Sequence, residues 1–220
     1  MALLEAVELY RFYHVGESEV VALRGVDFQL DAGELVALVG PSGSGKSTLL
    51  ACLAGLDDPD GGSVDLLGQR ISRRPEKVRA GIRGKHIGMF MQSGNLIDHL
   101  TVAGNIRLQR RLAGKLAGGD DAGVLAKLGI AERWNAMPSQ LSGGEAARAG
   151  LAVALAADPE LLFCDEPTGE VDAGTEAQIL ASLKEMRDAG AAILVATHSS
   201  ALARLADRVV HIRDGRIVDG

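Results

Sequence analysis

The sequence predicts an α/β protein built on a parallel β-sheet, and two observations support this prediction. Short apolar runs alternate with helix-forming stretches such as 175–189, which is the pattern of strands joined by crossover helices. A glycine-rich loop also joins one apolar run to a helix, an order that places the helix N-terminus beside a bound anion. The expected buried strands are residues 34–39, 160–165, 192–197 and 208–212.

The glycine-rich loop at residues 40–47, Gly-Pro-Ser-Gly-Ser-Gly-Lys-Ser, matches the phosphate-binding pattern G-x-x-x-x-G-K-[ST] in full. Its glycines let consecutive backbone N–H groups curl around phosphate oxygens without a Cβ clash. Lys46 adds a positive charge for the β- and γ-phosphates, and the Ser47 hydroxyl is suited to Mg²⁺. A chance match is the alternative, and the strand and helix on either side argue against it. The residues expected to bind nucleotide here are Gly40, Pro41, Ser42, Gly43, Ser44, Gly45, Lys46, Ser47 and Thr48.

Composition limits the classes of function. A chain of 220 residues with 47% hydrophobic content can form a single well-packed domain. Aromatic residues make up only 3% and the net charge is −6, which argues against a nucleic-acid binder. No apolar run reaches the roughly 18 residues of a membrane span, and no secretory signal is visible. We therefore expect a soluble, cytosolic protein in which Cys52 and Cys164 are buried thiols rather than a disulfide or metal pair.

The remaining segments predict further elements. The basic stretch 70–85 is interpreted as a solvated helical face, with a binding patch as the alternative. Asp214-Gly215 between two apolar runs predicts a hairpin. Other expected elements are strands within 3–39 with a turn at Gly33, a turn at 57–62, a strand at 87–91 and helices through most of 96–157.

Two carboxylates follow the apolar run at residues 161–164. Because ligands of open α/β sheets gather at the C-terminal ends of the strands, we expect Asp165 and Glu166 to lie at the nucleotide. Asp165 is placed to hold Mg²⁺, directly or through water. Glu166 is suited to act as the general base on an attacking water. Two carboxylates after an apolar run are weak evidence alone, but together with a complete phosphate loop in the same chain they indicate a catalytic site.

The segment Leu-Ser-Gly-Gly-Glu at residues 141–145 has no obvious task in an ATPase whose first loop already surrounds the phosphates. A serine and two glycines at the start of a helix provide a second anion site, made of backbone N–H groups, a hydroxyl and the helix dipole. Two anion sites for one nucleotide suggest that each ATP is held between two chains. An ordinary helix N-cap is the alternative interpretation.

One set of motifs has an order and spacing that match a known family: Tyr13, 40–48, Gln92, 141–145, Asp165-Glu166, Asp172 and His198. This set resembles the nucleotide-binding subunit of ABC transporters over essentially the whole chain. Segments 21–26, 87–92, 95–97, 100–105 and 206–216 add a finer likeness to the ATPases of lipoprotein-release and macrolide-export systems.

The resemblance implies a phosphate-loop NTPase with a RecA-like core and parallel sheet, N-terminal antiparallel strands and an inserted α-helical subdomain. Residues 1–220 would form one ABC ATPase domain. Its core would consist of residues 1–92 and 158–220, and the helical subdomain with the signature segment would be residues 93–157. ATP and Mg²⁺ are the implied ligands.

The resemblance also implies roles for single residues. Tyr13 would stack on adenine, with the neighbouring Phe12, or burial in the first strand, as alternatives. Gln92 would touch Mg²⁺ or its water, His198 would lie at the γ-phosphate, and Asp172 would cross to the opposite site. A polar loop residue, a structural histidine and a helix cap are their respective plainer interpretations. The implied catalytic residues are Glu166, His198, Gln92 and Lys46, the implied metal ligands are Ser47, Gln92 and Asp165, and the implied signature contacts to nucleotide are Ser142, Gly143, Gly144 and Glu145.

We therefore expect an ATP-hydrolysing subunit that forms a homodimer around two MgATP and drives a separately encoded membrane permease. The mode would be export, lipoprotein release or mechanotransmission, with the region 93–140 on the permease and the subunit on the cytoplasmic face of the membrane. A soluble ABC protein acting on nucleic acid or the ribosome is one alternative, which the acidic charge opposes. A small-molecule kinase with a phosphate loop is another, and it leaves 141–145 and His198 without a purpose.

The sequence departs from the family's usual residues at a few places. None of these departures removes a group that contacts phosphate, holds Mg²⁺ or activates water. We expect them to affect turnover and coupling between subunits rather than ATP binding. They are Ala146-Ala147 in place of two glutamines, Val153 in place of an arginine, Glu170-Val171 in place of Asn-Leu, and Ser199 in place of an aspartate.

Overall fold

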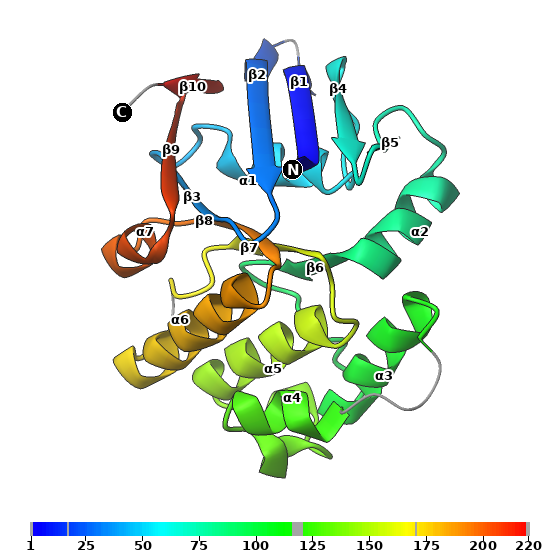
Figure 1. Ribbon diagram of the computed structural model, residues 1–220, viewed down its shortest axis with the longest axis vertical. Helices are drawn as coiled ribbons and strands as arrows, with labels where there is room; N and C mark the ends of the chain where they lie inside the picture. Colours follow the sequence, from blue (N-terminus) through cyan, green and yellow to red (C-terminus); the bar gives the residue numbers. More distant parts are fainter. Residues whose placement is uncertain (1, 17, 116–120, 170, 219–220) are drawn as a thin grey trace.

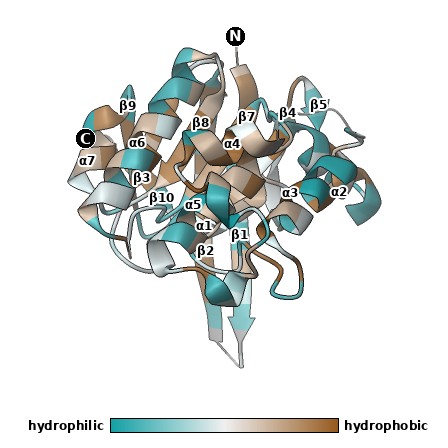
Figure 2. Cartoon of the chain, turned by 90° about the horizontal axis from the view of Figure 1, so that it is seen from below, coloured by the Kyte–Doolittle hydropathy of each residue, from teal (hydrophilic) through white to brown (hydrophobic). Residues whose placement is uncertain are grey.

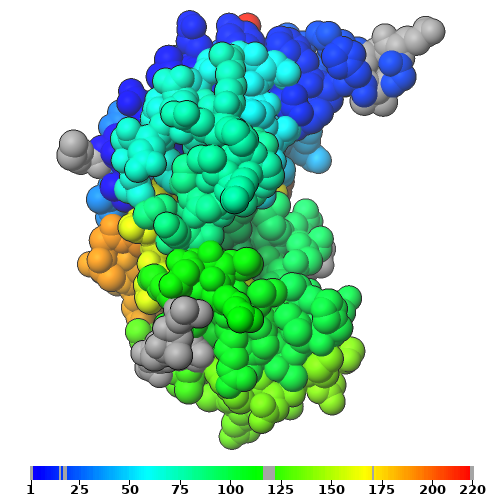
Figure 3. Space-filling model, turned by 90° about the vertical axis from the view of Figure 1, so that its right-hand side faces the viewer, coloured from blue at the N-terminus to red at the C-terminus, as the bar shows by residue number. Residues whose placement is uncertain are grey.

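The computed structural model describes residues 2–16, 18–115, 121–169 and 171–218. An antiparallel sheet forms the upper layer in Figure 1, with the strand order β2-β1-β4-β5. The long strands β1 and β2 make a hairpin that projects from the body of the molecule (Figure 3). The bounds of these strands are β1 (Ala2–Val15), β2 (Ser18–Asp31), β4 (Gly61–Leu66) and β5 (Gln69–Arg70).

The central sheet has the order β10-β9-β3-β8-β7-β6. Neighbouring strands from β9 to β6 are parallel, and β10 pairs antiparallel with β9. Every residue of β7 and β8 is buried, as expected for parallel strands that are covered on both faces. The bounds are β3 (Leu35–Val39), β6 (Ile87–Phe90), β7 (Leu161–Asp165), β8 (Ala192–Ala196), β9 (Arg208–Arg213) and β10 (Arg216–Val218).

The helices cover both faces of the central sheet. α1 (Lys46–Leu53) lies between the two sheets and contacts β1, β2, β7 and β8. α3 (Val102–Leu112), α4 (Asp121–Lys127) and α5 (Gly143–Leu155) lie together at the end of the molecule away from the antiparallel sheet (Figure 1). The remaining helices are α2 (Glu76–His86), α6 (Ala173–Asp188) and α7 (Ser200–Leu205), with short 3₁₀ turns at Ala131–Arg133 and Pro138–Gln140.

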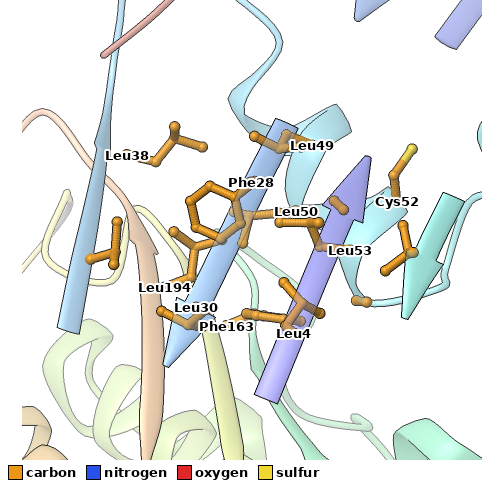
Figure 4. Close-up of a cluster of buried hydrophobic side chains, with 14 of the residues drawn as sticks. Leu4, Phe28, Leu30, Leu38, Leu49, Leu50, Cys52, Leu53, Phe163 and Leu194 are labelled. Atoms are coloured by element: carbon orange, nitrogen blue, oxygen red, sulfur yellow. The ribbon is translucent and has the colours of Figure 1, made fainter. Parts of the chain in front are cut away.

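Two hydrophobic cores hold these layers together. One packs α1 between the sheets and includes Leu4, Phe28 and Phe163 (Figure 4). The other packs α3, α4, α5 and α6 against the opposite face of the central sheet, around Leu151 and Ile193. Figure 2 shows the apolar residues concentrated on the central strands, whereas α2 is mostly polar. Each fully buried leucine or phenylalanine contributes about 1.5–3 kcal/mol to the free energy of folding. Because β3 and α1 are both anchored by such residues, the loop between them is fixed at both of its ends.

The predicted central strands, the helix at 175–189 and the C-terminal hairpin are confirmed, and the hairpin turn has positive φ at Asp214 and Gly215. Cys52 and Cys164 are buried free thiols, as expected. Helix α2 buries none of its residues completely, which agrees with the solvated face expected for the basic stretch.

The sequence reasoning missed strands β4 and β5 and helix α7. Strand β4 begins with two glycines, which usually indicate a turn. A Cβ at Gly62 would lie 2.2–2.3 Å from the carbonyl oxygens of Val7 and Glu8, and the φ of Gly62 is +79°. This glycine therefore lets β4 pair closely with an irregular part of β1.

Candidate nucleotide-binding site

The phosphate loop joins β3 to α1 and lies against two other strands. A Cβ at Gly40 would be 2.1 Å from the carbonyl oxygen of Ile212 in β9. One at Gly45 would be 2.6 Å from the carbonyl oxygen of Ala22 in β2, and the φ of Gly45 is +108°. Only glycine fits at these two positions, because the backbone packs directly on backbone. The loop is thus held in one shape, with the N-terminus of α1 behind it.

Two polar side chains of this loop, Lys46 and Ser44, are buried. Lys46 is only 7% exposed, and its Nζ donates to the carbonyl oxygens of Gly40 (2.8 Å) and Pro41 (3.1 Å). Ser44 is 3% exposed, and its Oγ has no hydrogen-bond partner among the described residues. The Lys46 ammonium supplies the positive charge that a bound phosphate group would pair with. The loop therefore fits a phosphate chain.

Asp165, Glu166 and His198 meet at the C-terminal edge of the central sheet. Asp165 ends β7 and is 7% exposed. Glu166 has a φ of +49°, a conformation that costs a non-glycine residue roughly 1–3 kcal/mol, and its N–H donates to the carbonyl of Ala196 at 2.9 Å. Glu166 Oε2 accepts from the backbone N–H of His198 at 3.2 Å, and His198 Nε2 lies 3.2 Å from Glu166 Oε1. The strained backbone thus directs the carboxylate to the histidine.

A cleft with a volume of about 1310 Å³ brings the predicted residues together. Its wall includes Asp165, Ser47 and Gln92, an oxygen-donor set that fits Mg²⁺. The other predicted residues that line it are Tyr13, Ser42, Gly43, Gly45, Lys46, Thr48, Gly143, Glu166 and His198. The predicted residues that do not line it are Gly40, Pro41, Ser44, Ser142, Gly144, Glu145 and Asp172.

Tyr13 rather than Phe12 borders the cleft. The Phe12 ring stacks on Tyr10, with centroids 6.4 Å apart and planes 13° from parallel. Tyr13 is half-buried, its hydroxyl donates to Asp57 Oδ2 at 2.8 Å, and the guanidinium carbon of Arg11 lies 4.6 Å from its ring centroid. The geometry therefore favours Tyr13 of the two aromatic candidates.

The loop that carries Gln92 is held by Asn95, a residue that sequence reasoning did not single out for this task. Asn95 Oδ1 accepts from the N–H of Met91 at 2.7 Å, and its Nδ2 donates to the Met91 carbonyl at 2.6 Å. A Cβ at Gly150 in α5 would lie 2.7 Å from the Cβ of Asn95. An asparagine soon after a strand is a signal for such a side-chain-to-backbone turn. The Gln92 loop therefore rests directly on α5.

The segment at 141–145 forms the N-cap of α5. Ser142 Oγ accepts from the N–H of Glu145 at 3.3 Å, and Glu145 Oε2 accepts from the N–H of Ser142 at 2.8 Å, which is a capping box. Hydrogen bonds from the Ser142 backbone and then from Arg133 lower the pKa of Glu145 to about 2. Ser142 and Gly143 are nevertheless exposed, and a Cβ at Gly143 would meet nothing within 4 Å. This end of the cap is therefore accessible from solvent.

Glu145→Gln should lower the thermal unfolding midpoint at pH 7, because the charged hydrogen bonds of the cap are weakened. The pKa of Glu145 is depressed on folding, so this stabilisation is complete above pH 4.5 and disappears as the pH falls toward 2. Calorimetric scans of both proteins across this range should show their midpoints converging. A difference in midpoint that does not change with pH would contradict the assignment.

Asp172 is likewise the N-cap of its helix, α6. Its Oδ1 accepts from the N–H groups of Gly174 (2.9 Å) and Thr175 (3.0 Å). Thr175 Oγ1 donates to Asp172 Oδ2 at 2.8 Å, and Arg148 of α5 donates to that same hydroxyl oxygen at 2.6 Å. Hydrogen bonds from Thr175, first its backbone N–H and then its hydroxyl, lower the pKa of Asp172. A Cβ at Gly144 would lie 2.6 Å from Thr175 Oγ1, so the first turns of α5 and α6 are in contact.

This arrangement of loop, carboxylates and signature can be compared with known proteins. A family model described as ABC transporter matches residues 23–169. The chain belongs to the ABC transporter family. It is an ATP-binding ABC ATPase. An uncharacterised ABC transporter ATP-binding protein of Thermotoga maritima is 40% identical over 217 residues, which are 97% of this chain and 93% of that protein.

Longer relatives and solved structures agree with the family. A macrolide export ATP-binding/permease protein of Chlorobium luteolum is 42% identical over 219 residues, covering 98% of this chain and 33% of that protein. The chain thus spans about a third of the length of these curated relatives. The dimeric structure of MJ0796, a bacterial ABC transporter cassette, superposes with a TM-score of 0.93 at 32% identity, covering 98% of this chain and 97% of that one. The same cassette has been solved as a dimer in a post-hydrolysis state bound to ADP and Pi, with a TM-score of 0.92.

The structure places most of the departures of this ABC ATPase from the family pattern. Ala146 and Ala147 line the cleft, and Val153 packs on the core around α5. Ser199 Oγ accepts from Leu202 N as the N-cap of α7 and donates to Glu176 at 3.0 Å. Glu170 lies outside the described residues. Within the part of the ATPase that the structure describes, no helix is long and apolar enough to cross a membrane.

Proposed function

We propose that this ABC ATPase forms a homodimer that holds two MgATP between its chains and uses their hydrolysis to drive a membrane permease on a separate chain. The subunit would act at the cytoplasmic face of the membrane, in export, lipoprotein release or mechanotransmission. The exposed cap residue Ser142 carries this proposal, because it does not line the cleft of its own chain, whereas its neighbour Gly143 does. The solved dimer of the MJ0796 cassette supports it.

The roles proposed for the site residues follow from their positions. The phosphate loop and Lys46 bind the triphosphate, while Ser47, Asp165 and Gln92 hold Mg²⁺, which neutralises phosphate charge when bound. Glu166 takes a proton from the attacking water at its carboxylate, and His198 keeps that carboxylate oriented through its backbone N–H. Tyr13 stacks on adenine. Asp172 and residues Ser142, Gly143, Gly144 and Glu145 complete the partner's site.

The test of the composite site is nucleotide-dependent dimerisation of Glu166→Gln. We expect this variant to be monomeric without ATP and dimeric with MgATP by light scattering, because the bound nucleotide is not consumed. Addition of Ser142→Arg should abolish the dimer. A variant that stays monomeric at saturating MgATP would contradict the proposal and favour a phosphate-loop enzyme that works as a single chain.

Residues 96–100 are proposed to contact the permease within the region 93–140. Ile97 is 39% exposed, and the side chain of Asn105 holds its backbone, with the Ile97 N–H donating to Asn105 Oδ1 at 2.8 Å. Leu96 instead packs against the helical core, so local packing explains part of this apolar segment. The alternative of a soluble ABC protein acting on nucleic acid or the ribosome has no supporting feature in this segment, because its exposed residues, Ile97, Asp98 and His99, include no lysine or arginine.

Ile97→Asp should reduce the fraction of the tagged subunit recovered with membranes, because a charge would enter an apolar contact. Binding of ATP to the purified variant should not change. Val209→Asp is the matched control, since Val209 is also 39% exposed but lies on β9. Equal membrane recovery of Ile97→Asp and wild type would place the permease contact elsewhere.

A further inference from the structure

The ring and the hydroxyl of Tyr13 are both held by one ion pair. Arg11 Nε donates to Asp57 Oδ2 at 2.8 Å and its Nη2 donates to Asp57 Oδ1 at 2.9 Å, which is a two-pronged contact. The same Asp57 Oδ2 accepts from the Tyr13 hydroxyl at 2.8 Å. The guanidinium carbon of Arg11 lies 4.6 Å from the Tyr13 ring centroid. Arg11 thus covers one face of the ring while Asp57 fixes its far end.

Asp57 is in turn fixed to the helix that starts in the phosphate loop. The N–H groups of Leu56 and Asp57 donate to the carbonyl of Ala51 in α1, at 2.9 and 3.1 Å. Gly55 turns the chain with a φ of +65°, where a Cβ would lie 2.7 Å from the side chain of Ile71. Since α1 begins at Lys46, the position of the Asp57 carboxylate is set by the same element that holds the phosphate loop.

A second aspartate attaches strand β1 to this turn. Asp60 Oδ2 accepts from Arg11 Nη1 at 3.0 Å and from the backbone N–H of Phe12 at 2.8 Å. The side chains of Arg11 and Asp57 are only 20% and 28% exposed, so solvent screens their attraction less than that of a surface pair. Burial raises the pKa of Asp57, but hydrogen bonds from Arg11 and Tyr13 outweigh it and lower that pKa overall, so the carboxylate stays charged at neutral pH. Burial and the hydrogen bond to Asp57 raise the pKa of Tyr13, which keeps its hydroxyl a donor.

We propose that Arg11 and Asp57 are positioning residues that hold the Tyr13 ring as a platform for the base, at a fixed place relative to the phosphate loop. This inference rests on the proposed function, in which Tyr13 stacks on adenine. With Arg11 on one face of the ring, the opposite face is the one that a planar base can use. The pair acts on the nucleoside end of the ligand and leaves the triphosphate contacts unchanged.

The test compares a ligand that has a base with one that lacks it. Arg11→Ala should weaken the binding of ATP about tenfold in calorimetric titrations, within the range expected for loss of a base-stacking contact. Its affinity for inorganic tripolyphosphate should not change. The KM for ATP should rise by about the same factor, with a smaller change in kcat. Asp57→Asn should behave like Arg11→Ala, and Arg11→Lys should restore only part of the affinity because it cannot form the two-pronged contact.

Two controls separate positioning from a general loss of structure. Arg70→Ala breaks the Arg70–Asp65 pair, which has the same two-pronged geometry (2.9 and 3.1 Å) between β4 and β5, and should leave both affinities unchanged. In a Tyr13→Ala background, the further Arg11→Ala change should have no effect on ATP binding, because the pair acts through the ring.

The possible failures are distinguishable. The positioning role is overturned if Arg11→Ala weakens ATP and tripolyphosphate equally, if it still weakens ATP after Tyr13 is removed, or if it changes neither affinity while Tyr13→Ala weakens ATP. If Tyr13→Ala itself binds ATP as well as wild type, the adenine role in the proposed function is wrong and the positioning role falls with it.

Discussion

Glu166→Gln is expected to lower kcat for ATP hydrolysis by roughly 10²–10⁴-fold while ATP still binds. The amide has almost the same shape as the carboxylate, and it can keep the hydrogen bond from the His198 backbone N–H to Oε2. It cannot accept a proton from water, so the chemical step alone is affected. Steady-state hydrolysis and equilibrium binding of ATP, measured on the same preparation, separate the two effects.

Strand β7 offers a matched control for this change. Glu160 lies directly before the first residue of the strand, at the end opposite Glu166. Its Oε1 lies 3.2 Å from His86 Nδ1, the same distance that separates Glu166 Oε1 from His198 Nε2. Glu160→Gln removes the same charge beside a histidine but at the edge of the sheet away from the phosphate loop. We expect it to hydrolyse ATP at the wild-type rate. If Glu166→Gln kept more than about half of the wild-type rate, another group would have to be the base.

The second large effect is expected in mixed dimers of two inactive variants. Lys46→Ala removes the positive charge that contacts the phosphates, so it should weaken ATP binding in its own chain. Ser142→Arg places a bulky cation on the exposed cap and should block the site of the other chain. A dimer with one copy of each variant has one site with both defects and one with neither. We expect it to recover up to half of the wild-type activity.

The same two substitutions placed on one chain provide the control. Lys46→Ala with Ser142→Arg in one chain, paired with a wild-type chain, gives each site one defect, so this dimer should be inactive. Joining the two chains by a flexible linker in one polypeptide fixes the composition of each mixed dimer. Equal activity of the two arrangements would contradict the composite site, and thermal unfolding of each variant shows whether it is folded.

The parts of the site that the sequence predicted are those in which function depends on neighbours along the chain. The phosphate loop, Asp165-Glu166 and the cap at Ser142 each lie within a few residues, so covalent spacing fixes their geometry and a short pattern is enough. The hairpin at Asp214-Gly215 was predictable for the same reason. Helix α7 was not predicted, because it has only 6 residues and its N-cap Ser199 comes soon after the end of strand β8.

Contacts between distant segments could not be inferred from one sequence. The partner of Arg11 lies 46 residues away, in a turn that the sequence marked only as a turn. The choice between Phe12 and Tyr13 depends on which side of β1 faces the cleft, and the register irregularity between Arg11 and Phe12 breaks the simple alternation of the strand. Strand β4 forms because it pairs with β1, and the local preference of its residues would not have predicted a strand.

The close contact at Gly144 has a mechanical consequence. A Cβ at Gly144 would collide with the Thr175 hydroxyl, which is also hydrogen-bonded to Asp172 and Arg148, so the first turns of α5 and α6 are joined by several short contacts. A rotation of α5 must either carry the Asp172 turn with it or separate all of these contacts at once. Force applied to the helical end of the molecule would therefore reach the segment that follows Glu166 without passing through the nucleotide.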